Sequence, residues 1–160
     1  MYVELGHYAL ILALLLSGAQ AFFGLAGPAF KRERWVAAVP SAACGQFVFV
    51  ALAVGTLIHA FVTDDFSVRY VAENSNTALP LFYRITAMWG AHEGSMLLWI
   101  LVLSLWTLAV VVRSGSLPRE FAARALGVLG VLSFGFVLFT LATSSPFTRL
   151  IPAADDVNSL

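Results

Sequence analysis

The sequence predicts an all-α fold: a polytopic membrane helical bundle of about four transmembrane helices, with an external interfacial segment. Of the 160 residues, 60% are hydrophobic and only 11% are charged, whereas about a quarter of the residues of a soluble domain are charged. Four apolar segments each have about the 20 residues needed to cross a hydrocarbon core of roughly 30 Å. Basic residues gather in the loops on one side of these segments. We therefore expect a single transmembrane region covering residues 1–160.

Composition also excludes several classes of protein. The formal net charge is zero, so neither a nucleic-acid partner nor a polybasic lipid-binding surface is indicated. The single cysteine, Cys44, permits no internal disulfide and no CxxC motif, and is expected to be a buried packing residue. The chain has no GxGxxG, Walker, HExxH or defensible Ser–His–Asp pattern, so the sequence predicts no catalytic residue and no metal site.

The apolar segments are residues 5–27, 36–62, 94–112 and 121–143. The first is expected to be a retained transmembrane helix and not a signal peptide. It is too long for one, and Glu4 precedes it where a signal peptide has basic residues.

Loop charges orient the predicted helices. One side holds six basic residues: Lys31, Arg32, Arg34, Arg113, Arg119 and Arg124. The other side is mostly acidic, and its charges include Glu4, Asp64, Asp65, Arg69, Glu73, Asp155 and Asp156. Because cytoplasmic loops are enriched in Lys and Arg, both termini and the loop 64–88 are predicted to be external.

The external loop is expected to be ordered. Phe66, Val68 and Tyr70 alternate with polar residues, which indicates a short extended stretch. The following "ENSNT", with Asn74 and Asn76, supplies turn and N-cap residues. Residues 80–88 begin with a proline and are rich in aromatic residues, which predicts a helix lying at the membrane interface. The alternative is a plain surface loop that connects two spans.

The stretch "WGAHEGSMLLWI" at 89–100 is polar for the start of a membrane helix. At helical spacing, one face carries His92, Met96, Trp99, Leu103 and Trp106. This stripe is expected to pack against neighbouring helices, and His92 to be an interfacial hydrogen-bonding residue.

A second strip consists of small residues. Gly90 and Gly94 form a GxxxG pair that is continued by Ala87, Ala91 and Ser95, a pattern that lets a neighbouring helix approach closely. Glu93 points away from the His92 face and needs water or a partner in the membrane, and Arg84 and Arg69 are the nearest basic candidates in the sequence.

Two further histidines, His7 and His59, lie near the predicted outer ends of the first two helices. Membrane histidines on different helices can clamp a haem iron, so this pair is a minor candidate for axial ligation.

The chain resembles the N-terminal part of the CcmF/NrfE family, integral membrane proteins of cytochrome c maturation. The similarity runs from "ELGHYALILAL" to "SSPFTRLIP", and the "SNTALP…WGAHEGS" block is its most specific part. The resemblance implies a bacterial inner-membrane haem lyase that attaches haem to the CxxCH motif of apocytochrome c on the periplasmic face. It also implies as partners membrane lipid, other maturation subunits, a haem chaperone and apocytochrome c.

Family members are several times longer, and their tryptophan-rich segment and haem-ligating histidines lie beyond this chain. The chain is therefore expected to be a fragment or split gene product that is not catalytic alone. Within it, the external residues are expected to support the haem-attachment site through packing and hydrogen bonds, with His92 and Glu93 bonded to the "SNT" loop. These residues are Asn74, Asn76, Arg84, Trp89, Gly90, His92, Glu93, Gly94, Ser95 and Trp99.

Two alternatives remain open from the sequence. One is a small transporter or channel piece that uses His92 and Glu93 as a proton or substrate site. The other is a structural helical scaffold for a partner subunit.

Overall fold

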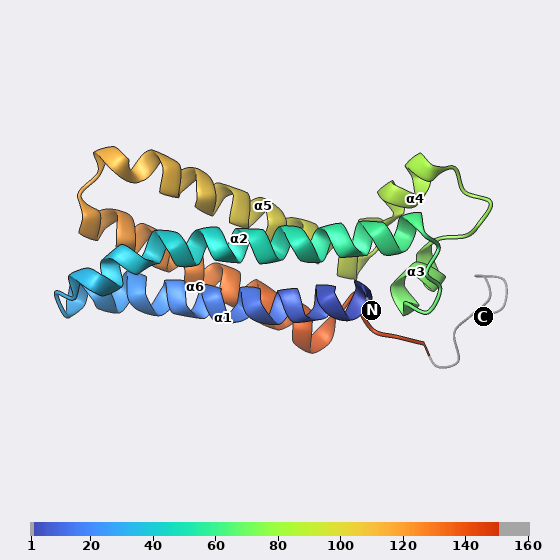
Figure 1. Ribbon diagram of the computed structural model, residues 1–160, viewed down its shortest axis with the longest axis horizontal. Coiled ribbons are helices and arrows are strands. Elements are labelled where there is room, and N and C mark those ends of the chain that lie inside the picture. The colour runs from blue at the N-terminus through green and yellow to red at the C-terminus, as the bar shows by residue number, and fades with distance from the viewer. Residues whose placement is uncertain (1, 151–160) are drawn as a thin grey trace.

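The computed structural model describes residues 2–150 and arranges four long helices as an up-and-down bundle (Figure 1). They are α1 (Tyr2–Ala29), α2 (Glu33–Val62), α5 (His92–Arg113) and α6 (Arg119–Thr143). Each of the four is long and apolar enough to cross a membrane, as the sequence predicts. The 30 residues of α2 correspond to about 45 Å at 1.5 Å per residue, so this helix extends past the hydrocarbon core.

A close contact between α1 and α6 depends on glycine. A Cβ on Gly24 would lie 2.5 Å from the Cα of Gly127, and a Cβ on Gly130 would lie 2.7 Å from the backbone nitrogen of Ala21. Such small residues let two membrane helices bring their backbones together. The chain therefore does contain a glycine-based helix crossing, although not in the stretch where the sequence pattern suggested one.

Buried polar side chains occur on all four long helices. Gln20 of α1 donates from Nε2 to the carbonyl oxygen of Leu126 at 2.6 Å. Gln46 of α2 is fully buried, and neither its amide nitrogen nor its amide oxygen has a hydrogen-bond partner within residues 2–150. The others are buried hydroxyl residues: Ser17, Thr56, Ser104, Thr107, Ser133 and Thr140.

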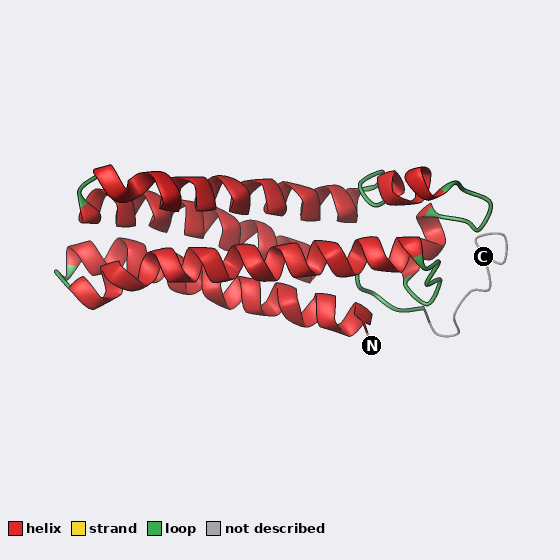
Figure 2. Ribbon diagram, turned by 45° about the horizontal axis from the view of Figure 1, so that its top comes forward, coloured by secondary structure: helices red, strands yellow, loops and turns green. Residues whose placement is uncertain are grey.

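The two ends of the bundle differ in structure (Figure 2). One end consists of the α1–α2 turn and the α5–α6 turn, which contains the short 3₁₀ helix η1 (Ser114–Ser116). The other end carries the start of α1 and the short helices α3 (Arg69–Asn74) and α4 (Leu81–Ala87). The structure thus confirms that the basic loops share one end and that the loop 64–88 lies at the other. Asp155 and Asp156, which the sequence also places at that end, lie outside the described residues.

Candidate functional site: the folded cap of the bundle

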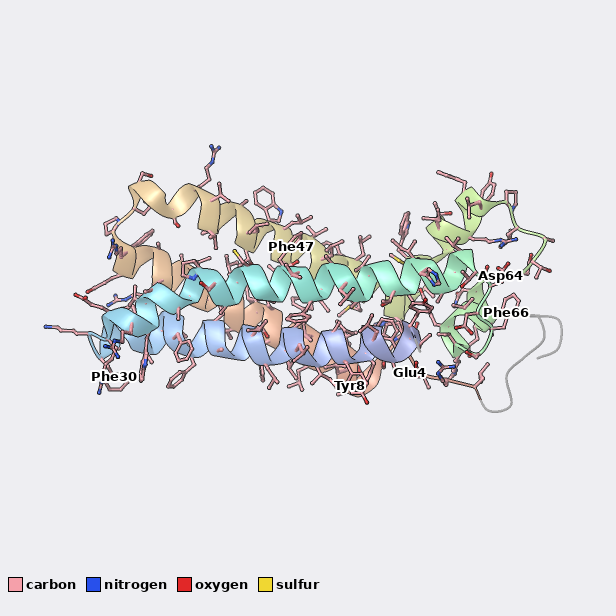
Figure 3. The ribbon with its side chains drawn as sticks, viewed as in Figure 1. Glu4, Tyr8, Phe30, Phe47, Asp64 and Phe66 are labelled. Atoms are coloured by element: carbon pink, nitrogen blue, oxygen red, sulfur yellow. The ribbon has the colours of Figure 1, made fainter. Side chains whose placement is uncertain are left out.

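A folded cap covers the end of the bundle where the chain starts; we use "cap" for residues 64–91 together with 144–150 (Figure 3). Its two segments are joined by backbone hydrogen bonds, from Arg69 N to Thr148 O at 2.9 Å and from Leu150 N to Ser67 O at 2.9 Å. The expected extended stretch is confirmed at Val68, which forms an antiparallel bridge with Arg149, and is wrong at Tyr70, because α3 starts at Arg69. The i,i+4 ion pair between Arg69 and Glu73, at 2.7 Å, is of the kind that favours a helix.

Tyr70 connects α3 to the start of α5. Its hydroxyl donates to the carbonyl oxygen of Met88 at 2.8 Å and lies 3.4 Å from that of Ala91. The ring is 3% exposed and packs edge-on against Phe61 with ring centroids 5.5 Å apart. Burial raises the pKa of this phenol above its ordinary value. Sequence reasoning missed Tyr70, because no local pattern shows which carbonyl groups, 18 and 21 residues away, its hydroxyl reaches.

The helix expected to run through "WGAHEGS" begins later than predicted. Residues 88–91 form a turn, in which Gly90 N donates to Ala87 O at 3.0 Å and Ala91 is extended, with φ −122° and ψ 178°. Ala87 therefore belongs to α4 and Gly90 to the turn. The prediction of a continuous small-residue strip along one helix is therefore wrong.

Gly94 nevertheless lies where only hydrogen fits. It is buried in the first turn of α5, and a Cβ there would overlap the carbonyl oxygen of Met88 and lie 2.6 Å from the Tyr70 hydroxyl. The atoms that crowd Gly94 belong to the cap, not to another transmembrane helix. Tyr70, Met88 and Gly94 thus form one contact that holds the cap on the bundle.

Arg84 makes a second contact, within the cap, between α4 and the turn that follows α2. It donates from Nε to Leu79 O at 2.8 Å and from Nη2 to Thr77 O at 2.9 Å, and its Nη1 pairs with an Asp64 carboxylate oxygen. Asp64 occupies the left-handed position that ends α2, with φ 52°, and the following Asp65 N donates to Ala60 O at 3.0 Å. This C-terminal turn ends α2 and leads the chain into the cap.

The two predicted asparagines act locally within the cap. Asn74 Nδ2 donates to Tyr70 O at 2.9 Å, so it supports the residue that holds the cap. Asn76 Oδ1 accepts from Ala78 N at 3.0 Å and shapes the loop before α4. Of the predicted supporting residues, the structure therefore brings Asn74, Arg84 and Gly94 into the two contacts of the cap.

The structure does not bring His92 and Glu93 into these contacts. His92 is exposed, its ring centroid lies 6.3 Å from that of Phe139, and its backbone oxygen accepts from Ser95 Oγ at 2.9 Å. Within residues 2–150, neither side chain has a hydrogen bond or ion pair. The expected network of these two side chains with the "SNT" loop is not formed, and the carbonyl oxygen of Thr77 in that loop accepts from Arg84 Nη2 at 2.9 Å.

Glu93 is not paired with either of the arginines that the sequence suggested. It lines a small polar cavity of about 90 Å³ together with Arg69, Glu73 and Thr143. The hydrogen bond that Arg69 Nε donates to the Glu73 carboxylate is the main cause that raises the pKa of Arg69, and the Glu93 carboxylate adds to it.

The tryptophans of the WGAHEGS stretch and of α5 face outward. Trp89 is 41% exposed, Trp99 is 68% exposed and Trp106 is 67% exposed. Trp99 and Trp106 therefore face away from the bundle, contrary to the expected packing, whereas His92 of the same stripe lies beside Phe139 of α6. The exposure of the two tryptophans leaves an apolar surface on α5 toward lipid or another helix.

His7 and His59 lie in different surroundings in the described chain. His7 lines a cavity of about 320 Å³ between α1 and residues 145–149, near the Glu4–Arg149 ion pair of 2.6 Å. His59 is exposed, and its ring packs on Tyr2 with centroids 4.9 Å apart. No cavity that the structure gives is lined by both histidines, and axial ligation by this pair stays a prediction.

Four apolar spans and a folded cap define a polytopic α-helical membrane protein. In sequence and in structure, the chain corresponds to the N-terminal part of the CcmF/NrfE family of cytochrome c-type biogenesis proteins. It is 51% identical over its whole length to CcmF of Pseudomonas aeruginosa and 46% identical over 95% of its length to CcmF of Escherichia coli. NrfE of Haemophilus influenzae is 40% identical over 96% of the chain.

A solved structure described as the cytochrome c haem lyase CcmF supports this assignment. It aligns over 94% of the chain with a TM-score of 0.88 at 29% identity. The chain spans about a quarter of each of these proteins: 25% of the P. aeruginosa relative, 24% of the E. coli and H. influenzae relatives and 25% of the solved structure. No protein-family model matches the chain.

Proposed function

We propose that this chain is the N-terminal membrane region of a cytochrome c haem lyase, and that its cap supports the site where haem is attached to apocytochrome c. The observation that carries the proposal is the match of nearly the whole chain, in sequence and in fold, to CcmF proteins. The reaction joins haem vinyl groups to the thiols of a CxxCH motif, so haem is here a substrate.

The role of this chain in that reaction is positional. Tyr70, through Met88 and Gly94, holds the cap on α5, and Arg84, through Asp64, holds α4 against the turn that ends α2. A rigid support of this kind keeps the surface that meets apocytochrome c in one orientation, which is what a protein contributes when the cofactor carries the chemistry. The haem ligands come from parts of the protein beyond these residues.

The proposal includes a location and partners. The basic end of the bundle lies in the cytoplasm and the cap in the periplasm of a bacterial inner membrane, as the positive-inside rule suggests. The partners are apocytochrome c, a haem chaperone and other maturation subunits, with membrane lipid around the helices.

A scaffold for a partner subunit is a second candidate, which the outward-facing Trp99 and Trp106 favour, since such a stripe offers a surface to another helix. The transporter alternative has less support, because His92 is exposed on α5 and lines none of the cavities that the structure gives.

The experiment is complementation of a bacterial strain that lacks its own CcmF. The residues of this chain replace the matching quarter of the host CcmF, and covalent haem in a reporter cytochrome c is measured by haem staining. We expect restored staining, and reduced staining with Arg84→Gln. Absence of staining while the exchanged protein is present at a normal level would contradict the proposal.

A further inference from the structure

The end of the bundle opposite the cap contains the largest cavity that the structure gives, with a volume of about 780 Å³. It lies between the α1–α2 turn and the α5–α6 turn. Its lining is apolar on one side, where α2 and α6 contribute Val36, Ala37, Pro40, Ala122, Ala123 and Leu126. A cavity of this size and composition is in the range that holds a small molecule or part of a lipid.

The rim of this cavity is charged. It carries Lys31 and Arg119, both exposed, and the carboxylates of Glu33 and Glu120. Neither basic side chain has an ion-pair partner among the described residues. Glu33 and Glu120 lie in the first turns of α2 and α6, where the helix dipole stabilises a negative charge.

The surroundings of the cavity are positively charged. Six basic residues lie in the two turns and at the adjoining helix ends, against these two carboxylates: Lys31, Arg32, Arg34, Arg113, Arg119 and Arg124. The long helices on either side are long and apolar enough to span a membrane, so the cavity lies at one membrane surface. Basic pockets between transmembrane helices at that level bind acidic lipid headgroups.

We propose that this cavity binds one phospholipid with an acidic headgroup. The phosphate lies between Lys31 and Arg119, and an acyl chain covers the apolar lining near Val36 and Leu126. The site is independent of the cap and of the proposed lyase function. Binding here joins the α1–α2 turn to the α5–α6 turn, which the cavity otherwise separates.

Native mass spectrometry of the purified protein in mild detergent tests this proposal. The protein is titrated with phosphatidylglycerol and, separately, with phosphatidylcholine of the same acyl chains. We expect a one-to-one phosphatidylglycerol adduct that exceeds the phosphatidylcholine adduct at least fivefold. In the double variant Lys31→Gln, Arg119→Gln, the phosphatidylglycerol adduct should fall at least fivefold.

Two further variants locate the lipid. Arg113→Gln changes an exposed basic residue of the same turn that does not line the cavity, so its adduct should equal that of the unchanged protein. Ala37→Phe fills the cavity from an exposed position, which should displace the lipid, and circular dichroism checks that each variant is folded.

Several results would overturn the proposal. Equal adducts in the unchanged protein and the double variant would show only annular lipid, and equal adducts of the two lipids would show no headgroup recognition. A full adduct in Ala37→Phe would place the lipid elsewhere. No adduct in the unchanged protein would show that the cavity does not take a lipid.

Discussion

Replacing Gly94 with alanine is the sharpest test of how the cap is held. The added Cβ would overlap the carbonyl oxygen of Met88 and lie 2.6 Å from the Tyr70 hydroxyl. Met88 is 1% exposed, so its backbone cannot move aside without displacing packed neighbours. Overpacking of this kind costs about 1–3 kcal/mol, and loss of the hydrogen bond from Tyr70 adds about 1 kcal/mol.

Gly94→Ala should therefore destabilise the protein by at most about 2–4 kcal/mol. This sum is an upper range, because the two effects act on neighbouring atoms and do not add fully. The measurement is the midpoint of thermal unfolding in detergent, followed by tryptophan fluorescence. Gly90→Ala is the matched control in the same motif, since its Cβ would lie 3.3 Å from Ala87 O and requires only a small shift. An unchanged midpoint for Gly94→Ala, or equal losses in the two variants, would refute the reasoning.

Three other predictions concern the cap, the bundle and the topology. Tyr70→Phe removes the hydrogen bond to the Met88 carbonyl and should cost about 1 kcal/mol in thermal unfolding. The raised pKa of Tyr70 stabilises the fold fully below the unfolded-state pKa of about 10. This stabilisation is lost as the pH rises through the higher folded-state value, so the unchanged protein should lose stability in that alkaline range while Tyr70→Phe loses less; parallel pH profiles would contradict this. Gln46→Leu removes a buried amide without a hydrogen-bond partner among the described residues and should leave the midpoint of thermal unfolding unchanged or raise it. Gln20→Leu removes the hydrogen bond to Leu126 O and should lower the midpoint, by a loss of stability of about 1 kcal/mol. A lower midpoint for Gln46→Leu than for Gln20→Leu would be inconsistent with these contacts. In a variant lacking the native cysteine, a membrane-impermeant thiol reagent applied outside intact cells should label Thr77→Cys and not Arg32→Cys, and external labelling at position 32 would overturn the proposed topology.

The spans were predictable because their signal is local. A run of about 20 apolar residues must cross the membrane as a helix, whatever it packs against, since no water satisfies its backbone there. The basic loops likewise fixed which ends lie together, and Pro80 marked the start of α4. These features depend on a residue and its immediate neighbours.

The cap was less predictable because contacts between distant segments decide it. Tyr70 is helical and reaches Met88 across the cap, and neither fact follows from the alternation of Phe66, Val68 and Tyr70. The identity of Gly94 as a constrained residue could be inferred from its motif, but the group that constrains it could not. The glycine crossing of α1 and α6 was missed because Gly24 and Gly127 are more than a hundred residues apart.

The central claim is that this chain supports haem attachment by holding the cap, and not by providing a chemical group. The measurement is the yield of covalently haem-bound cytochrome c, per unit of folded protein, in the complementation strain. Arg84 ties the loop before α4 to Asp64, so Arg84→Gln should lower this yield severalfold. The His92 side chain is exposed and has no hydrogen bond within the described residues. His92→Gln should therefore retain most of this yield. Complete loss with His92→Gln at a normal protein level, together with full yield for Arg84→Gln, would contradict the account and make the start of α5 a chemical site.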